Sequence, residues 1–98
     1  MMDEKRTYPI SITVNGRSIH KVVIDPHYEA KHKESMSDQI ILELVGLLDG
    51  KTFLPEDEDD NFQYFKTEPL ILRGLSYRLV WLLEADEIYI GVVNAFRR

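Results

Sequence analysis

The chain has 98 residues, of which 44% are hydrophobic and 30% charged, and it contains no cysteine. This composition predicts one folded domain over residues 1–98 and excludes disulfides, thiolate metal sites and thiol nucleophiles. The formal net charge of −5 disfavours nucleic-acid binding unless the basic groups gather on one face.

The beginning of the chain, Met1 to Arg6, is charged and is not followed by an apolar stretch like that of a signal peptide. The longest apolar run near the other end, Leu79 to Leu83, has the length of a strand and is far shorter than a membrane span. We therefore expect a cytoplasmic protein that does not enter a membrane.

The first predicted element is a β-hairpin over residues 8–14 and 17–24. Asn15 and Gly16 join its strands, and this dipeptide is preferred in two-residue type I′ turns. Such a turn predicts Ile12 opposite Ile19 and, further along the same face, Ile10 opposite Lys21.

Two helical segments follow the hairpin. Asp25 and Pro26 suit the start of a short helix over residues 26–34. A capping pattern over residues 35–38 then predicts the beginning of the main helix, which runs from about Ser37 to Asp49 and stops at Gly50. Its broad apolar stripe indicates one face buried in the core.

The acidic run from Glu56 to Asp60 accounts for the whole net charge, because the remaining residues are formally neutral without it. Residues 55–61 show no helical or strand periodicity, which predicts a solvated loop with no structural role. A cation or partner site there is the alternative, but the spacing of a calcium-binding loop is missing.

The rest of the chain predicts four strands, over residues 62–66, 69–72, 77–84 and 87–95, with a turn at Arg73 and Gly74. A tight turn at residues 85–86 would place Leu83 opposite Ile88 and Trp81 opposite Ile90, with Trp81 buried. The expected fold is thus α+β. An antiparallel sheet, built from the N-terminal hairpin and a C-terminal meander, packs on one long helix in the order ββαββββ.

Motifs for nucleotide, dinucleotide, metal and nucleophilic-serine chemistry are missing, so we expect no cofactor and no metal. His27 and His32 are five residues apart and would point in different directions from a helix. Side chains that could cleave a phosphodiester without a metal remain, since this chemistry needs a base, an acid and a cation. They are His27, His32, Tyr64, Arg78, Arg97 and Arg98.

Arg78 is the most informative of these candidates, because it lies in an otherwise apolar strand. Strand alternation predicts that it points to the face that holds Tyr89 and Val93, together with Arg97. An arginine at such a position requires an anion or a carboxylate. The alternative is a structural ion pair with an acid such as Glu84 or Glu43.

Three segments, Ile24 to His32, Tyr77 to Leu83 and Tyr89 to Arg98, resemble the RelE-like toxin superfamily, in particular its branch of small BrnT-type proteins. The resemblance implies a toxin of a toxin–antitoxin pair, an endoribonuclease that cleaves messenger RNA without a metal and is held by an antitoxin protein. It places His27, His32, Arg78 and Arg97 at the matching catalytic positions. The alternative is a non-enzymatic interaction module, an inactive relative that holds a protein partner.

Overall fold

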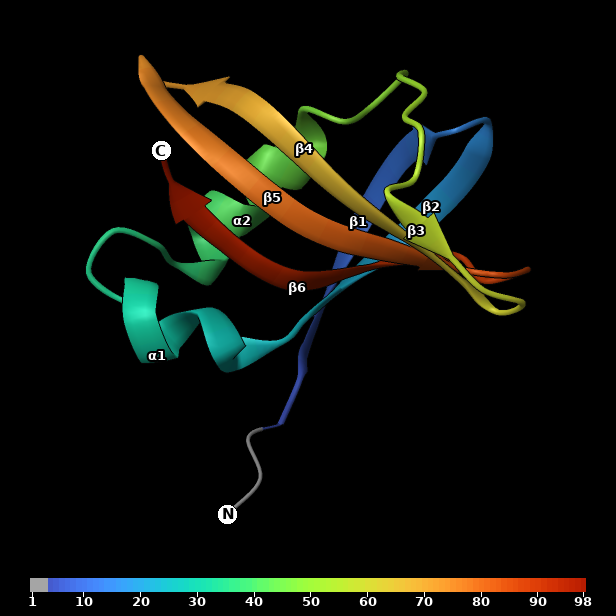
Figure 1. Cartoon of the computed structure of the whole chain (residues 1–98), viewed down its shortest axis with the longest axis horizontal. Helices are drawn as coiled ribbons and strands as arrows, with labels where there is room; N and C mark the ends of the chain where they lie inside the picture. The colour runs from blue at the N-terminus through green and yellow to red at the C-terminus, as the bar shows by residue number, and fades with distance from the viewer. Residues whose placement is uncertain (1–3) are drawn as a thin grey trace.

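A computed structural model describes residues 4–98, and residues 1–3 of the charged N-terminal segment lie outside the described part (Figure 1). One sheet contains all six strands in the order β1-β2-β6-β5-β4-β3. The elements, in chain order, are β1 (Arg6–Val14), β2 (Arg17–Ile24), η1 (Pro26–Tyr28), α1 (Glu29–His32), α2 (Asp38–Gly46), β3 (Asp57–Glu58), β4 (Phe62–Leu72), β5 (Leu75–Glu84) and β6 (Tyr89–Arg97).

The sheet is mixed, because β2 and β6 run parallel while every other neighbouring pair is antiparallel. Val22 lies beside Ile90 and Ile24 beside Val92 in the parallel pair. The expected antiparallel sheet on one long helix, in the order ββαββββ, is therefore wrong. The edge strand β2 of the hairpin pairs in parallel with the edge strand β6 of the meander, which forms one continuous sheet.

The helices are short. The first predicted helix is a single turn of η1 followed by the four residues of α1, and α2 has nine residues. The helix α2 starts near Ser37 as expected, but Ser37 itself and not Ser35 is the cap, since the Ser37 hydroxyl accepts a hydrogen bond from the Ile40 N–H at 3.2 Å. The helix ends early because the Leu47 and Leu48 N–H groups bond three residues back, which tightens the last turn. Within residues 4–98, none of the helices has the length and apolar character needed to span a membrane.

The N-terminal hairpin forms as predicted. Asn15 and Gly16 both have positive φ, which a type I′ turn requires, and Ile12 lies opposite Ile19. Beyond that pair the register shifts, so that Pro9 and not Ile10 lies opposite Lys21. A bulge in β1 adds a residue at this point, and no feature of the turn could have revealed it.

The C-terminal strands differ from the expectation in length and register. Residues 62–72 form one strand, β4, with an irregularity between Thr67 and Leu70, and the turn at Arg73 and Gly74 follows as predicted. Leu83 lies opposite Ile90, not Ile88, because the connection between β5 and β6 is longer than two residues.

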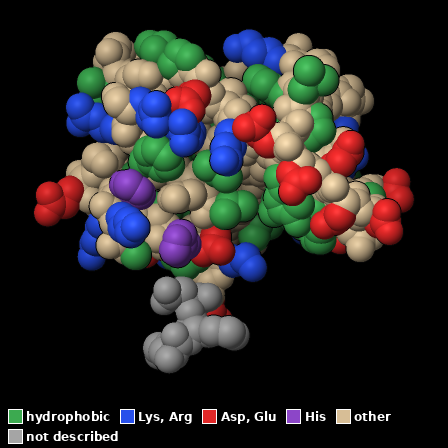
Figure 2. Space-filling model, in the orientation of Figure 1, with side chains coloured by type: hydrophobic (Ala, Val, Ile, Leu, Met, Phe, Trp, Pro, Cys, Tyr) green, Lys and Arg blue, Asp and Glu red, His purple; other side chains and the backbone are tan. Residues whose placement is uncertain are grey.

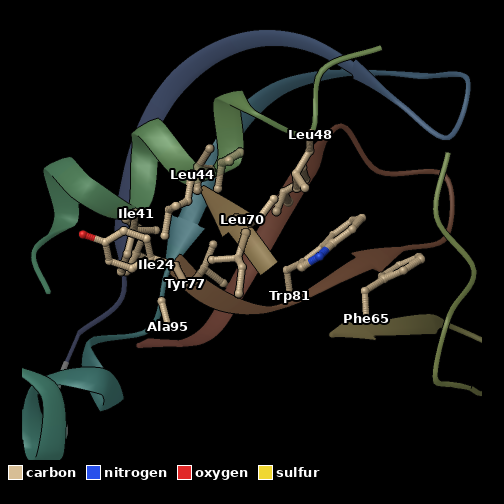
Figure 3. Packing of buried hydrophobic residues seen from close by; sticks show 14 of the residues in the cluster. Ile24, Ile41, Leu44, Leu48, Phe65, Leu70, Tyr77, Trp81 and Ala95 are labelled. Carbon is tan, nitrogen blue, oxygen red and sulfur yellow. The ribbon is translucent and has the colours of Figure 1, made fainter. Parts of the chain in front are cut away.

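The hydrophobic core lies between α2 and one face of the sheet. Figure 3 shows the side chains of Ile41, Leu44 and Leu48 directed toward sheet residues that include Leu70 and Trp81. Trp81 is fully buried, as predicted. Its ring stacks on that of Phe65, with centroids 4.0 Å apart, but the register places Val92 and not Ile90 opposite it.

A polar group at the edge of this core joins the first strand to both helical segments. The Asp38 carboxylate accepts hydrogen bonds from Arg6 at 2.6 and 2.9 Å, from the Tyr28 hydroxyl at 2.7 Å and from the Tyr8 hydroxyl. The Arg6 guanidinium and the two hydroxyls hold the pKa of Asp38 at about 2, although partial burial opposes this effect. Sequence reasoning assigned Asp38 only to the start of a helix.

The acidic segment has more structure than predicted. Asp57 and Glu58 form β3 and pair with Tyr64 and Gln63 of β4. Asp59 closes the turn, because its carboxylate accepts hydrogen bonds from the backbone N–H groups of Asn61 at 2.9 Å and Phe62 at 2.8 Å. These two bonds lower the pKa of Asp59.

We expect Asp59→Ala to lower the melting temperature by a few degrees, because two backbone donors of the turn lose their acceptor. Asp60→Ala removes the same charge one residue further on and is the matched control, which should leave the melting temperature unchanged. Thermal unfolding followed by circular dichroism measures both. Equal shifts in the two variants would mean that only the charge of the segment matters.

Candidate functional site: a basic cluster on the uncovered sheet face

Among the described residues, α2 packs on only one face of the sheet, and the other face is contacted by a helix only at one end, where His32 of α1 lies. In Figure 1, α2 passes behind β4 and β5, so the nearer face of the sheet is the one opposite the core. We call this the uncovered face. Half-buried side chains form its centre, among them Tyr64, Val80, Leu82 and Val93.

Phe96 organises a group of side chains at one end of the uncovered face. The His32 imidazole stacks on the Phe96 ring, with centroids 5.0 Å apart and planes inclined by 22°. The guanidinium carbon of Arg78 lies 5.4 Å from the centroid of the same ring, within range of a cation–π interaction. The strand register explains the second contact, since Arg78 of β5 lies directly opposite Phe96 of β6.

Glu68 holds two arginines beside this ring. One of its carboxylate oxygens pairs with the Arg78 guanidinium, and the other lies 3.0 Å from Nε of Arg98. The Arg98 N–H donates to the Ser76 carbonyl at 2.8 Å, which continues the pairing of the chain with β5 and directs Arg98 to the uncovered face. His32, Glu68, Arg78, Phe96 and Arg98 are called the basic cluster below.

Arg78 is the most enclosed cation of the cluster. Its side chain is 26% exposed, and its Nε is buried without a hydrogen-bond partner among the described residues. An unpaired buried donor is costly unless a ligand or water satisfies it. Two guanidinium groups against one carboxylate also leave excess positive charge, which attracts an anion.

Charge is distributed unevenly over the molecule. Figure 2 shows Lys, Arg and His side chains over α1 and the end of β6, and Asp and Glu side chains gathered on the opposite side, around β3. Lys31 of α1 and Lys33 directly after it are exposed beside His32, and the exposed acids Glu29 and Glu34 flank them. Although the net charge is −5, the cations are concentrated at this end, which weakens the expected objection to a polyanionic ligand.

The structure brings together two of the four predicted catalytic residues, His32 and Arg78. His27 lies on η1 and is exposed, and its backbone N–H donates to the Asp25 carboxylate. Arg97 lies opposite Tyr77, whose side chain is in the core, so Arg97 belongs to the α2 side of the sheet. The prediction that Arg78 and Arg97 share a face is wrong, because an additional residue in β6 at Val93 reverses the alternation beyond it.

The alternative expectation, a structural ion pair for Arg78, is right that a carboxylate pairs with this arginine but wrong about which residue provides it. Its carboxylate is Glu68, whereas Glu43 pairs with Arg73 at 2.5 Å and Glu84 accepts a hydrogen bond from the Tyr89 hydroxyl at 2.5 Å. Burial and this bond with Glu84 raise the pKa of Tyr89 to about 12.

Glu68 and Phe96 were missed by sequence reasoning, and Arg98 was named only as a general candidate. The break assigned at residues 67–68 placed Glu68 outside any strand, although β4 continues through it. The only hint in the sequence was that an acid, Glu68, and an arginine, Arg78, lie in consecutive strands. Pairing them requires the strand register, which is irregular beside Pro69.

Taken together, the basic cluster combines groups with three chemical abilities. Arg78 and Arg98 can bind an anion, Glu68 can accept a proton and His32 can accept or donate one. Within residues 4–98, no group of three or more His, Asp or Glu side chains is arranged to hold a metal ion. No family model, curated protein or solved structure matches the chain, so its function is inferred from this geometry.

Proposed function

We propose that this chain is a metal-independent endoribonuclease that acts on messenger RNA, a toxin of the RelE-like kind that an antitoxin protein holds inactive. The observation that carries the proposal is the convergence of His32, Glu68, Arg78 and Arg98 on the uncovered face. Because messenger RNA is translated in the cytoplasm, we propose that compartment for the protein.

Internal cleavage of RNA by this cluster needs no additional reactant. Arg78 and Arg98 would bind the phosphate and stabilise the charge that develops on it. Glu68, freed from one arginine when the phosphate binds, would take the proton of the 2′-hydroxyl, whose oxygen attacks phosphorus. Protonated His32 would donate its proton to the departing 5′-oxygen. The products are a 2′,3′-cyclic phosphate and a 5′-hydroxyl, so bonds and protons balance.

The position of the cluster supports an RNA substrate over a small anion. It lies at the basic end of an open sheet face, where a long chain can pass without entering a closed cavity. Phe96 and the half-buried aromatic ring of Tyr64 lie on the same face, and bases of single-stranded RNA stack on such rings.

We expect Arg78→Ala to slow cleavage of a synthetic RNA in the presence of EDTA by about 10²-fold, because the main phosphate cation is lost. His32→Ala should slow it to a similar degree. Arg97→Ala is the matched control, an arginine on the opposite face whose removal should leave the rate within about twofold of the original. The product termini and the folding of each variant are measured in parallel.

Two results would contradict the nuclease. One is the absence of cleavage by the unaltered protein, and the other is equal loss of activity and stability in the Arg78 and Arg97 variants. Binding to RNA should also weaken steeply as salt is raised, because several phosphate contacts release counterions. A binding constant independent of salt would indicate that phosphate is not the group recognised.

A non-enzymatic interaction module is the second candidate, and the apolar centre of the uncovered face favours it. Val80, Leu82 and Val93 are half-buried there, and no helix or strand of residues 4–98 covers them, as in surfaces that bind a protein partner. Induced expression in a bacterial host separates the candidates. Growth arrest that Arg78→Ala relieves supports the nuclease, whereas unimpaired growth supports the module.

A further inference from the structure

The uncovered face also contains a hollow, about 320 Å³ in volume, beside the middle of β6. Side chains of β2, β4, β5 and β6 surround it, among them Val23, Phe62, Leu82, Tyr89 and Val93. Its volume lies at the lower end of the range for small-molecule sites. Nothing in the proposed cleavage chemistry uses it.

Gly91 shapes the floor of the hollow, because it leaves room for the side chain of Leu82. A Cβ atom at this position would lie 2.8 Å from Cδ1 of Leu82, which is too close for the two side chains to coexist as they are. Without a side chain at Gly91, Leu82 and the edge of the Tyr89 ring settle over the backbone. The result is an apolar floor with an aromatic ring on one side, the surroundings that a planar heterocycle requires.

The polar groups of the hollow are a cation and a carboxylate, Lys5 and Asp25. One oxygen of Asp25 accepts a hydrogen bond from the His27 N–H at 2.9 Å, so the other oxygen is available for a ligand. A carboxylate accepts hydrogen bonds from the amino group of cytosine and from similar donors on other bases, but uracil offers it no amino group. Lys5 carries the charge suited to a neighbouring phosphate.

The hollow and the basic cluster lie along the same strand. Five residues of β6 separate Gly91 from Phe96, which corresponds to about 16 Å at 3.3 Å per residue. A few nucleotides of an extended single strand cover such a separation.

We propose that this hollow is a nucleobase subsite that favours a base with an exocyclic amino group, such as cytosine, over uracil, a few nucleotides from the bond at the basic cluster. The inference rests on the proposed function, since it assigns the sequence preference of the same RNA site. The Asp25 carboxylate provides the preference for an amino group, and Leu82, packed over Gly91, forms the apolar floor of the subsite.

Binding of short 2′-deoxy oligonucleotides, which cannot be cleaved by attack of a 2′-hydroxyl, tests the subsite. Fluorescence anisotropy compares a set of hexamers in which one position carries cytosine, uracil or no base. We expect the unaltered protein to prefer cytosine over uracil by about tenfold at one position. Asp25→Asn should remove this preference, while its side-chain oxygen still caps η1.

A second variant, Val93→Phe, fills the hollow from its half-buried rim and should weaken binding of the cytosine hexamer to the level of the hexamer without a base. Lys21→Ala, an exposed lysine on the neighbouring strand, is the control for a general loss of charge and should keep the preference. Thermal unfolding of each variant confirms that it is folded.

The possible outcomes separate this inference from the proposed function. Tight binding with equal affinity for all hexamers overturns the subsite and leaves the nuclease intact. A cytosine preference that depends on Asp25, in a protein that never cleaves RNA, supports the subsite and overturns the nuclease. No binding of any hexamer, at low salt, overturns both.

Discussion

Replacing Trp81 by alanine is expected to lower the free energy of unfolding by about 3 to 5 kcal/mol, most of the stability of a domain of this size. Trp81 is fully buried, stacks on Phe65 with planes inclined by 10° and meets the Phe53 ring edge-on at 5.6 Å. Its indole N–H donates to the Thr67 hydroxyl at 2.9 Å. The substitution removes all of these contacts and leaves a cavity that the sheet cannot close.

Equilibrium unfolding in urea measures this loss, with circular dichroism as the signal because the variant lacks its only tryptophan. Leu75→Ala is the control, since Leu75 is 40% exposed at the end of β5 and its loss should cost well under about 1 kcal/mol. Similar losses in both variants would show that Trp81 is not part of a packed core. In the unaltered protein, tryptophan fluorescence should have the short-wavelength maximum of a buried indole.

The second large effect is expected at Asp38, where one carboxylate joins β1, η1 and α2. Asp38→Ala should cost about 3 kcal/mol at neutral pH, because Arg6 and the hydroxyls of Tyr8 and Tyr28 then lose their shared acceptor. The side chain of Asp38 is only 17% exposed, so water replaces these bonds poorly. Chemical unfolding at pH 7 measures the loss.

The same carboxylate predicts a dependence of stability on pH. Its pKa is about 2 in the folded protein, below the 3.8 of a free aspartate, so the folded state favours the charged form. The stabilisation is therefore complete above about pH 4 and is lost as the pH falls through 2, with a total of about 2 kcal/mol. Asp38→Asn should remove this part of the slope between pH 4 and pH 2.

Asp60→Asn is the control for the acid experiment, because Asp60 is exposed in the turn of the acidic segment. It should leave the slope between pH 4 and pH 2 almost unchanged. If Asp38→Asn unfolds with the same dependence on pH as the unaltered protein, the carboxylate does not gain its stability from Arg6 and the two tyrosines.

Strand alternation placed Arg78 correctly, but it could neither place Arg97 nor find Glu68. Alternation correctly directs Arg78 away from the core, because the strand around it is regular. It fails for Arg97, since one additional residue near Val93 reverses the face of everything beyond it. Likewise, no local signal pairs Glu68 with Arg78, because the two lie on neighbouring strands across an irregular register.

The sequence by itself determined the local elements of this protein: the Asn15–Gly16 hairpin, the start of α2 near Ser37, the Arg73–Gly74 turn and the burial of Trp81. Each follows from backbone preferences or from apolar periodicity within a few residues. Only the tertiary structure decided the parallel union of β2 with β6, the uncovered face and the assembly of the basic cluster. These three features depend on which strand edges and side chains meet when distant segments pack together. The free energy of the whole core, and no local pattern, determines that arrangement.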